Sequence, residues 1–250
     1  MKLTYRPEID GLRAIAVISV VIYHARFLLE EKFFLKGGFI GVDIFFVISG
    51  YLITSLIYKE YLKEKKFSYI NFYQRRIRRI LPALIFVISL SSCVAYIYLL
   101  PTALKDFANS SLSSIFFASN IFFWNTSVEY SATSELFRPL LHTWSLSIEE
   151  QFYLFFPVIF IFLLKKFEKN LLIIILFVFC ISLLFSNYGN TNFQSLNFYI
   201  IFSRGWELLA GSIISIIEIK YNRNLYLNKF LSNALSLLGL VCEDHVPSGV

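Results

Sequence analysis

The sequence predicts an all-α protein, a polytopic bundle of transmembrane helices. Of its 250 residues, 57% are hydrophobic and only 16% are charged, a composition too apolar for an ordinary water-soluble domain of this length. Six apolar segments are predicted to cross a bilayer, and a weaker seventh follows them. The basic residues cluster between these segments, as is typical of membrane proteins.

The predicted spans comprise residues 12–29, 39–58, 80–100, 152–164, 171–185 and 198–217, with the shorter segment at 230–241. The fourth segment reaches spanning length only if its helix starts near Trp144. That start draws Glu149 and Glu150 into the membrane boundary. Ionisable groups in such places usually have a function.

The distribution of lysine and arginine predicts a cytoplasmic N-terminus. Most of these residues lie in the even-numbered connections and few in the odd-numbered ones. The first even connection, 59–79, holds Lys59, Lys63, Lys65, Lys66, Arg75, Arg76, Arg78 and Arg79. The long outward connection, 101–142, contains an aromatic stretch at 115–124 that is too short to span, and we expect it to re-enter the membrane or to cap a cavity.

The net charge of +6 does not indicate a nucleic-acid-binding protein, because the basic residues lie between apolar segments rather than along a solvated face. The cysteines Cys93, Cys180 and Cys242 lie in or beside apolar stretches and lack paired spacing. We therefore expect neither a disulfide framework nor a metal site.

Arg13 and His24 are two ionisable side chains in the first predicted span. Eleven residues bring a helix within roughly 20° of three whole turns, so both side chains share one face, about 16 Å apart along the axis. This places Arg13 near a membrane surface and His24 well inside, as at a functional site. A structural interpretation also exists: the arginine can reach lipid headgroups, and the histidine can hydrogen-bond a neighbouring helix.

The second predicted span begins with a glycine-rich segment that leads to Asp43, near the outer end of the span. The stretch 45–51, which includes Ser49 and Tyr51, follows in mid-membrane. Small residues there allow close helix approach, and glycines alone indicate packing more often than catalysis.

A third polar cluster covers residues 142–152. On a helix, His142 and Ser145 would share a face with Glu149. Glu149 could instead orient the start of the fourth span from its first turn. Further along, Arg204 and Glu207 are three residues apart in the sixth span, and their most economical role is an internal ion pair.

Together these motifs resemble the membrane-bound acyltransferase family 3, which includes the O-acetylases of bacterial lipopolysaccharide and peptidoglycan. Arg13 and His24 match its arginine-x10-histidine signature, and the stretches 5–14, 45–51 and 142–152 look like the corresponding family phrases. The stretch 75–79 supplies its arginine-x-x-arginine element twice, and 204–207 resembles its arginine-x-tryptophan-glutamate element. The match runs in order from about residue 5 to residue 211.

The resemblance implies an integral enzyme of the bacterial inner membrane that holds no bound cofactor. It would transfer an acyl group, usually acetyl, from cytoplasmic acyl-coenzyme A. The acceptor would be a hydroxyl of a cell-surface glycan or lipid-linked saccharide, such as O-antigen or peptidoglycan. Its partners would thus be acetyl-coenzyme A, the glycan and membrane lipids, and no nucleic acid.

The chemistry of the residues suggests roles that fit this resemblance, and we state them as hypotheses. His24 would be the general base that takes a proton from the sugar hydroxyl, and Arg13 would steady the donor or the thioester oxygen. Glu149 or Glu150 would orient His24 or bind the acceptor. The guanidinium groups of Arg75, Arg76, Arg78 and Arg79 suit the phosphates of coenzyme A. The other candidate substrate-binding residues are Asp43, Ser49, Tyr51, His142, Ser145, Arg204 and Glu207.

The C-terminal part departs from the family, which commonly has about ten spans and in this branch often continues into an extracytoplasmic esterase-like domain. We therefore predict an incomplete acyltransferase domain at 1–241 and an atypical polar tail at 242–250, from a truncated or frameshifted chain. Two alternatives remain. One is a transporter or flippase, in which Arg13, His24, Asp43 and Glu207 line a pathway, and the other is an inactive remnant.

Overall fold

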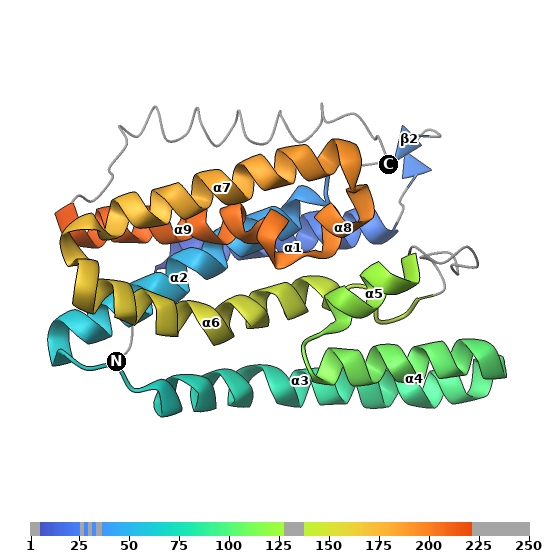
Figure 1. Cartoon of the computed structure of the whole chain (residues 1–250). Coiled ribbons are helices and arrows are strands. Elements are labelled where there is room, and N and C mark those ends of the chain that lie inside the picture. Colours follow the sequence, from blue (N-terminus) through green and yellow to red (C-terminus); the bar gives the residue numbers. More distant parts are fainter. Residues whose placement is uncertain (1–5, 26–27, 30–31, 34–36, 128–137, 222–250) are drawn as a thin grey trace. The chain divides into compact units, whose positions relative to one another are not determined.

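The computed structural model describes residues 6–25, 28–29, 32–33, 37–127 and 138–221. The polypeptide divides into two compact units, one formed by Met1–Lys63 with Glu207–Val250 and the other by Glu64–Trp206. Helices make up almost all of the described part of the chain, so the predicted all-α class is confirmed (Figure 1).

Four stretches of the described chain are long and apolar enough to cross a membrane: Ile40–Glu64, Tyr69–Tyr98, Thr143–Asn192 and Gln194–Tyr221. The third contains two successive helices, joined by a short 3₁₀ turn. The predicted span at 230–241 lies outside the described residues. The protein is a membrane protein.

The first unit contains α1 (Pro7–Ala25), the short strands β1 (Leu28–Leu29) and β2 (Lys32–Phe33), α2 (Ile40–Glu64), and α9 (Ile201–Tyr221) from Glu207 onward. Proline at the first helical position and acidic residues in the first turn favour the start of α1. The expected span 12–29 is wrong at its end, because β1 pairs antiparallel with β2 and the helix stops at Ala25. Apolar composition alone does not distinguish a helix from a strand.

Glycines allow the helices of this unit to approach closely. A Cβ on Gly41 would lie 2.5 Å from the carbonyl oxygen of Ala16 in α1. A Cβ on Gly50 would lie 1.8 Å from the carbonyl oxygen of Leu208 in α9, so no larger residue fits this crossing without movement. Hydroxyl pairs lie beside the crossing: Thr54 donates to Ser212 at 2.9 Å, and Ser55 and Ser215 are 2.7 Å apart.

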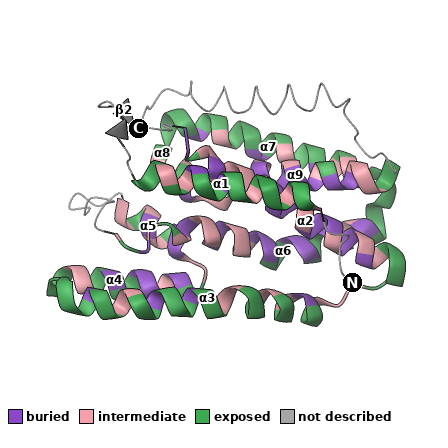
Figure 2. Cartoon of the chain, turned by 180° about the vertical axis from the view of Figure 1, so that it is seen from behind, coloured by how far each residue is buried: buried purple, intermediate pink, exposed green. Residues whose placement is uncertain are grey.

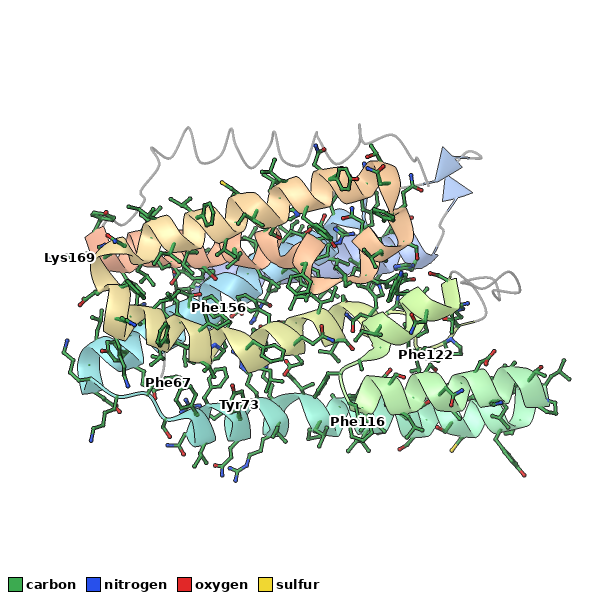
Figure 3. All side chains as sticks on the ribbon, viewed as in Figure 1. Phe67, Tyr73, Phe116, Phe122, Phe156 and Lys169 are labelled. Atoms are coloured by element: carbon green, nitrogen blue, oxygen red, sulfur yellow. The ribbon has the colours of Figure 1, made fainter. Side chains whose placement is uncertain are left out.

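The second unit contains α3 (Tyr69–Tyr98), α4 (Pro101–Ile115), α5 (Ser119–Ser127), α6 (Thr143–Phe167), η2 (Glu168–Asn170), α7 (Leu171–Asn192), α8 (Gln194–Tyr199) and the first residues of α9. In Figure 1, α4 lies along α3, and α5 lies between α4 and α6. On α6, Phe152, Phe156 and Phe160 form a buried stack, with ring centroids 4.4 and 5.1 Å apart (Figure 3).

Two predicted connections of this region are helical. The helix α3 begins at Tyr69, where Ser68 caps it, so Arg75–Arg79 lie on a helix and not in a loop. The expected outward loop 101–142 contains α4 and α5. Conversely, α6 starts at Thr143, which confirms the early start that its span required.

Many large apolar side chains along α3 and α7 are exposed (Figure 2). In a membrane protein such faces contact lipid, which is as apolar as the side chains themselves. Proline lies within both α3 and α6, at Pro82 and Pro157, as transmembrane helices tolerate.

Candidate active site

The predicted site residues are divided between the two units. The first unit carries Arg13, His24, Asp43, Ser49, Tyr51 and Glu207, and the second carries Arg75, Arg76, Arg78, Arg79, His142, Ser145, Glu149, Glu150 and Arg204. Within the described part of the chain, no three histidine, cysteine or acidic side chains are grouped so as to hold a metal ion.

Arg13 and His24 lie on one unbroken helix, α1. Their eleven-residue spacing therefore places both on one face, about 16 Å apart. Arg13 Nη1 is 3.8 Å from Asp10 Oδ1, and 28% of the arginine side chain is exposed. His24 is exposed and meets the ring of Tyr23 edge to face, with centroids 5.1 Å apart. It lies in the last turn of α1 rather than in the middle of a span, because the helix ends one residue later.

The predicted residues of α2 and α9 lie at different depths in the first unit. Asp43 lies in the first turn of α2 and is half-buried, whereas Ser49 and Glu207 are buried. The hydroxyl of Tyr51 has two charged neighbours that the sequence did not single out, Arg6 and Glu218. Tyr51 donates to Glu218 Oε2 at 2.6 Å and accepts from Arg6.

In the second unit, the four arginines of α3 have different surroundings. Arg76 is half-buried, and its guanidinium carbon lies 4.5 Å from the ring centroid of Tyr153 on α6. Arg75, Arg78 and Arg79 are exposed. Beside Arg76, the hydroxyl of Tyr73 donates to the carbonyl of Leu154 at 2.7 Å, a second contact between α3 and α6 (Figure 3).

The acidic pair of α6 lies near this arginine cluster. Glu149 accepts a hydrogen bond from Tyr153, one turn further along the helix. Glu150 is within electrostatic range of Glu149, Arg76 and Arg79, and its Oε1 is buried with no hydrogen-bond partner among the described residues. This neighbourhood depends on the packing of α3 against α6, and sequence spacing gives no signal for it.

The start of α6 also carries a buried hydroxyl network, which the sequence reasoning missed. Thr143 lies 2.8 Å from Ser114 and donates to Ser119 at 2.9 Å, and Ser119 lies 2.7 Å from Ser147. Next to it, Gln151 donates to the side-chain oxygen of Asn120 at 2.8 Å. Alternating serines in a stretch expected to be helical were the only signal.

Other residues at this end of the second unit have local contacts. His142 is exposed and precedes the first residue of α6, and Ser145 donates to its carbonyl at 3.2 Å. The guanidinium of Arg204 lies over the rings of Phe198 and Trp144, at 5.1 and 5.9 Å from their centroids. The expected ion pair between Arg204 and Glu207 stays a prediction.

A family model described as an acyltransferase domain matches residues 6–242. The chain belongs to this acyltransferase family. It is 36% identical to the O-acetyltransferase OatA of Staphylococcus aureus (strain NCTC 8325 / PS 47) over 94% of its own length. It is also 36% identical to the peptidoglycan O-acetyltransferase OatA of Listeria monocytogenes (serovar 1/2a, strain EGD-e), over 85% of its length.

The acyltransferase chain covers only part of these relatives, 38% of the Staphylococcus protein and 34% of the Listeria protein. No solved structure matches it. The family resemblance drawn from the motifs is confirmed, and the match contains every predicted site residue.

Proposed function

We propose that this acyltransferase moves an acetyl group from acetyl-coenzyme A to a hydroxyl of a cell-surface glycan. The observation that carries the proposal is the placement of Arg13 and His24 on one face of α1, in a chain that is 36% identical to O-acetyltransferases. Peptidoglycan is our first choice of acceptor, because one relative is named for it. O-antigen and lipid-linked saccharides carry the same kind of hydroxyl.

His24 acts as the general base in this proposal. The acceptor oxygen forms a bond to the thioester carbonyl carbon, and the carbon–sulfur bond then breaks to release coenzyme A. The hydroxyl proton passes to the neutral imidazole and from there to the leaving thiolate. The exposed imidazole at the end of α1 is accessible to an acceptor.

Arg13 binds the donor. At about 16 Å from His24 along the helix, it is too far away for one acetyl group to contact both residues, so an extended thioester arm lies between them. Its neighbour Asp10 has a side chain that is 52% exposed and lies 3.8 Å away, a contact that an incoming anion can replace.

The arginines of α3 divide into two roles. Arg75, Arg78 and Arg79 are exposed and can hydrogen-bond the coenzyme A phosphates with their planar, charged groups. Arg76 lies over Tyr153 and holds α3 against α6. Glu150 lies within electrostatic range of Arg76 and Arg79, and Glu149 accepts a hydrogen bond from Tyr153, the ring beneath Arg76.

The excess of basic residues in the connection after α2 supports a cytoplasmic N-terminus and donor site, in a chain of the bacterial inner membrane. The acceptor glycan would then be on the opposite side. Arginine clusters also act as topology signals, and the two roles are compatible.

The test is coenzyme A release from acetyl-coenzyme A by the purified, reconstituted chain with muropeptides as acceptor. We expect release that depends on acceptor, is abolished by His24→Ala and persists in His245→Ala, a control histidine in the predicted polar tail at 242–250. Full activity of His24→Ala would contradict the proposal. Acceptor movement across the bilayer without consumption of acetyl-coenzyme A would favour a transporter.

A further inference from the structure

A charged cluster joins three helices of the first unit. Arg6 Nη1 lies 3.0 Å from Glu218 Oε1 of α9 and donates to the hydroxyl of Tyr51 in α2. The same hydroxyl donates to Glu218 at 2.6 Å. The three side chains therefore form a closed triangle of charge-assisted hydrogen bonds, the stronger kind. We call it the Arg6 clamp.

The clamp is attached directly to α1. The carbonyl of Arg6 accepts a hydrogen bond from the backbone N–H of Ile9 at 3.1 Å, so Arg6 is the residue from which the first turn of α1 begins. Glu8 receives a further hydrogen bond from Arg6 at 2.7 Å, which lowers the pKa of this exposed carboxyl. The same hydrogen bond, with the nearby charge of Glu218, raises the pKa of Arg6.

Arg6 directly precedes the helix that carries the proposed reaction residues, Arg13 and His24. The buried residues of α1 are Ala16 and Ser19, and a Cβ on Gly41 or Gly38 would lie 2.5 or 2.4 Å from their carbonyl oxygens, so this side of α1 packs against α2 and the residues before it. Arg13 and His24 lie roughly 60–140° around α1 from Ala16 and Ser19 and are not buried, so holding the packed side of the helix fixes the direction in which both reaction residues point.

The Arg6 clamp binds α2 and α9, and these two helices are tightly packed against each other. The backbones of α2 and α9 meet at Gly50 and Gly211, where an added Cβ would lie 1.8 and 1.9 Å from carbonyl oxygens of the opposite helix. Near the other end of α1, a Cβ on Gly38 would lie 2.8 Å from the Cβ of Tyr23, the neighbour of His24. Contacts near both ends of a helix fix its rotation and its position along the axis.

We propose that Arg6, Tyr51 and Glu218 are positioning residues, which hold α1 so that Arg13 and His24 face the donor and acceptor. This inference rests on the proposed function. It gives Tyr51 a role through Arg6, in place of the substrate contact that the motif suggested. A shift of about 1 Å in a reacting group can lower a rate by up to 10²-fold, so even small movements of α1 are costly.

The experiment compares two clamp variants, Tyr51→Phe and Glu218→Gln, with two matched controls in the full chain. Glu8→Gln removes a contact of Arg6 that is outside the clamp, and Ser55→Ala removes a hydrogen bond between α2 and α9 that does not involve Arg6. For each we measure kcat, the KM for acetyl-coenzyme A and the thermal midpoint in detergent.

We expect the clamp variants to lower kcat by about tenfold or more with the KM within about twofold of wild type. The double variant should lose no more than the worse single variant, because the residues act as one unit. The controls should keep wild-type kcat. Wild-type kcat in both clamp variants, or an equal loss in the controls, would overturn the proposal.

A second readout does not depend on activity. Spin labels at Ile15 and Ile18, two exposed positions of α1, report collisions with dissolved oxygen in a background without Cys93, Cys180 and Cys242. We expect Tyr51→Phe to change the ratio of the two collision rates, and Glu8→Gln to leave it unchanged. If the ratio of collision rates is unchanged in Tyr51→Phe as well as in Glu8→Gln, the Arg6 clamp does not position α1. Failure of the proposed function has a different signature, a wild-type chain that never consumes acetyl-coenzyme A.

Discussion

Arg76 and Arg78 lie two residues apart on α3, yet their surroundings give them different functions. Arg78→Gln removes an exposed cation that we assign to a coenzyme A phosphate. We expect the KM for acetyl-coenzyme A to rise about fivefold, which corresponds to about 1 kcal/mol, with kcat little changed. Steady-state kinetics measures this. Lys105→Gln, which removes an exposed charge from α4, is the control and should have no effect.

Arg76→Gln should act mainly on stability. It removes the guanidinium over Tyr153, a contact of about 0.5–1 kcal/mol, and loosens α3 from α6. Thermal unfolding in detergent should therefore start at a lower temperature than for Arg78→Gln. Equal midpoints in the two variants, with equal effects on KM, would contradict the division of roles.

Ser145 and Ser147, near the start of α6, differ in burial and in hydrogen bonding. Ser147 is buried and accepts from the backbone N–H of Ser119 at 3.2 Å, whereas Ser145 bonds only within its own turn among the contacts resolved here. Ser147→Ala leaves a buried N–H without this acceptor, and we expect a loss of about 1–3 kcal/mol in unfolding free energy. Ser145→Ala should change it by less than about 0.5 kcal/mol. Denaturant titration of the two variants measures these unfolding free energies. Comparable losses in Ser147→Ala and Ser145→Ala would contradict a stabilising role for the buried hydroxyl network.

At the scale of helices, the crossing of α2 and α9 depends on Gly50. Gly50→Ala would place a methyl group 1.8 Å from the carbonyl of Leu208, and we expect overpacking to cost about 1–3 kcal/mol. Gly11→Ala is the control, because nothing lies within 4 Å of that position in α1, and alanine there should stabilise by up to about 1 kcal/mol. The thermal midpoint of unfolding should fall in purified Gly50→Ala and rise or stay the same in purified Gly11→Ala. A neutral Gly50→Ala would show that the helices separate readily.

Helix positions were easier to predict than helix ends. The apolar runs located α2, α6 and α7, because burial in a bilayer requires long apolar stretches. The start of α3 was missed by eleven residues, since its first turns carry arginines that only the Ser68 cap marks as helical. The end of α1 was missed because Leu28–Leu29 are as apolar in a strand as in a helix.

The site shows the same limit. The shared face of Arg13 and His24 follows from the helical repeat and needs no tertiary information. The contacts of Tyr51 with Arg6 and Glu218 join positions 45 and 167 residues apart, and no local pattern marks them. Likewise, the approach of Arg76 to Tyr153 required the packing of two helices.

For the whole molecule, the charge distribution predicts which side of the membrane each connection occupies. We expect Lys66→Cys, between α2 and α3, to react with an impermeant thiol reagent only after bacterial spheroplasts are permeabilised. Asn125→Cys, exposed in α5, should react in intact spheroplasts. Both variants are made without the native cysteines, and the reversed pattern would contradict a cytoplasmic N-terminus.

The central claim is His24-dependent transfer of an acetyl group across the membrane. Proteoliposomes that enclose muropeptides and receive labelled acetyl-coenzyme A on the side of Lys66 test it directly. We predict that label accumulates on the enclosed glycan with the wild-type chain and not with His24→Ala. Equal labelling by both chains, or labelling only when donor and acceptor share one side, would contradict the account.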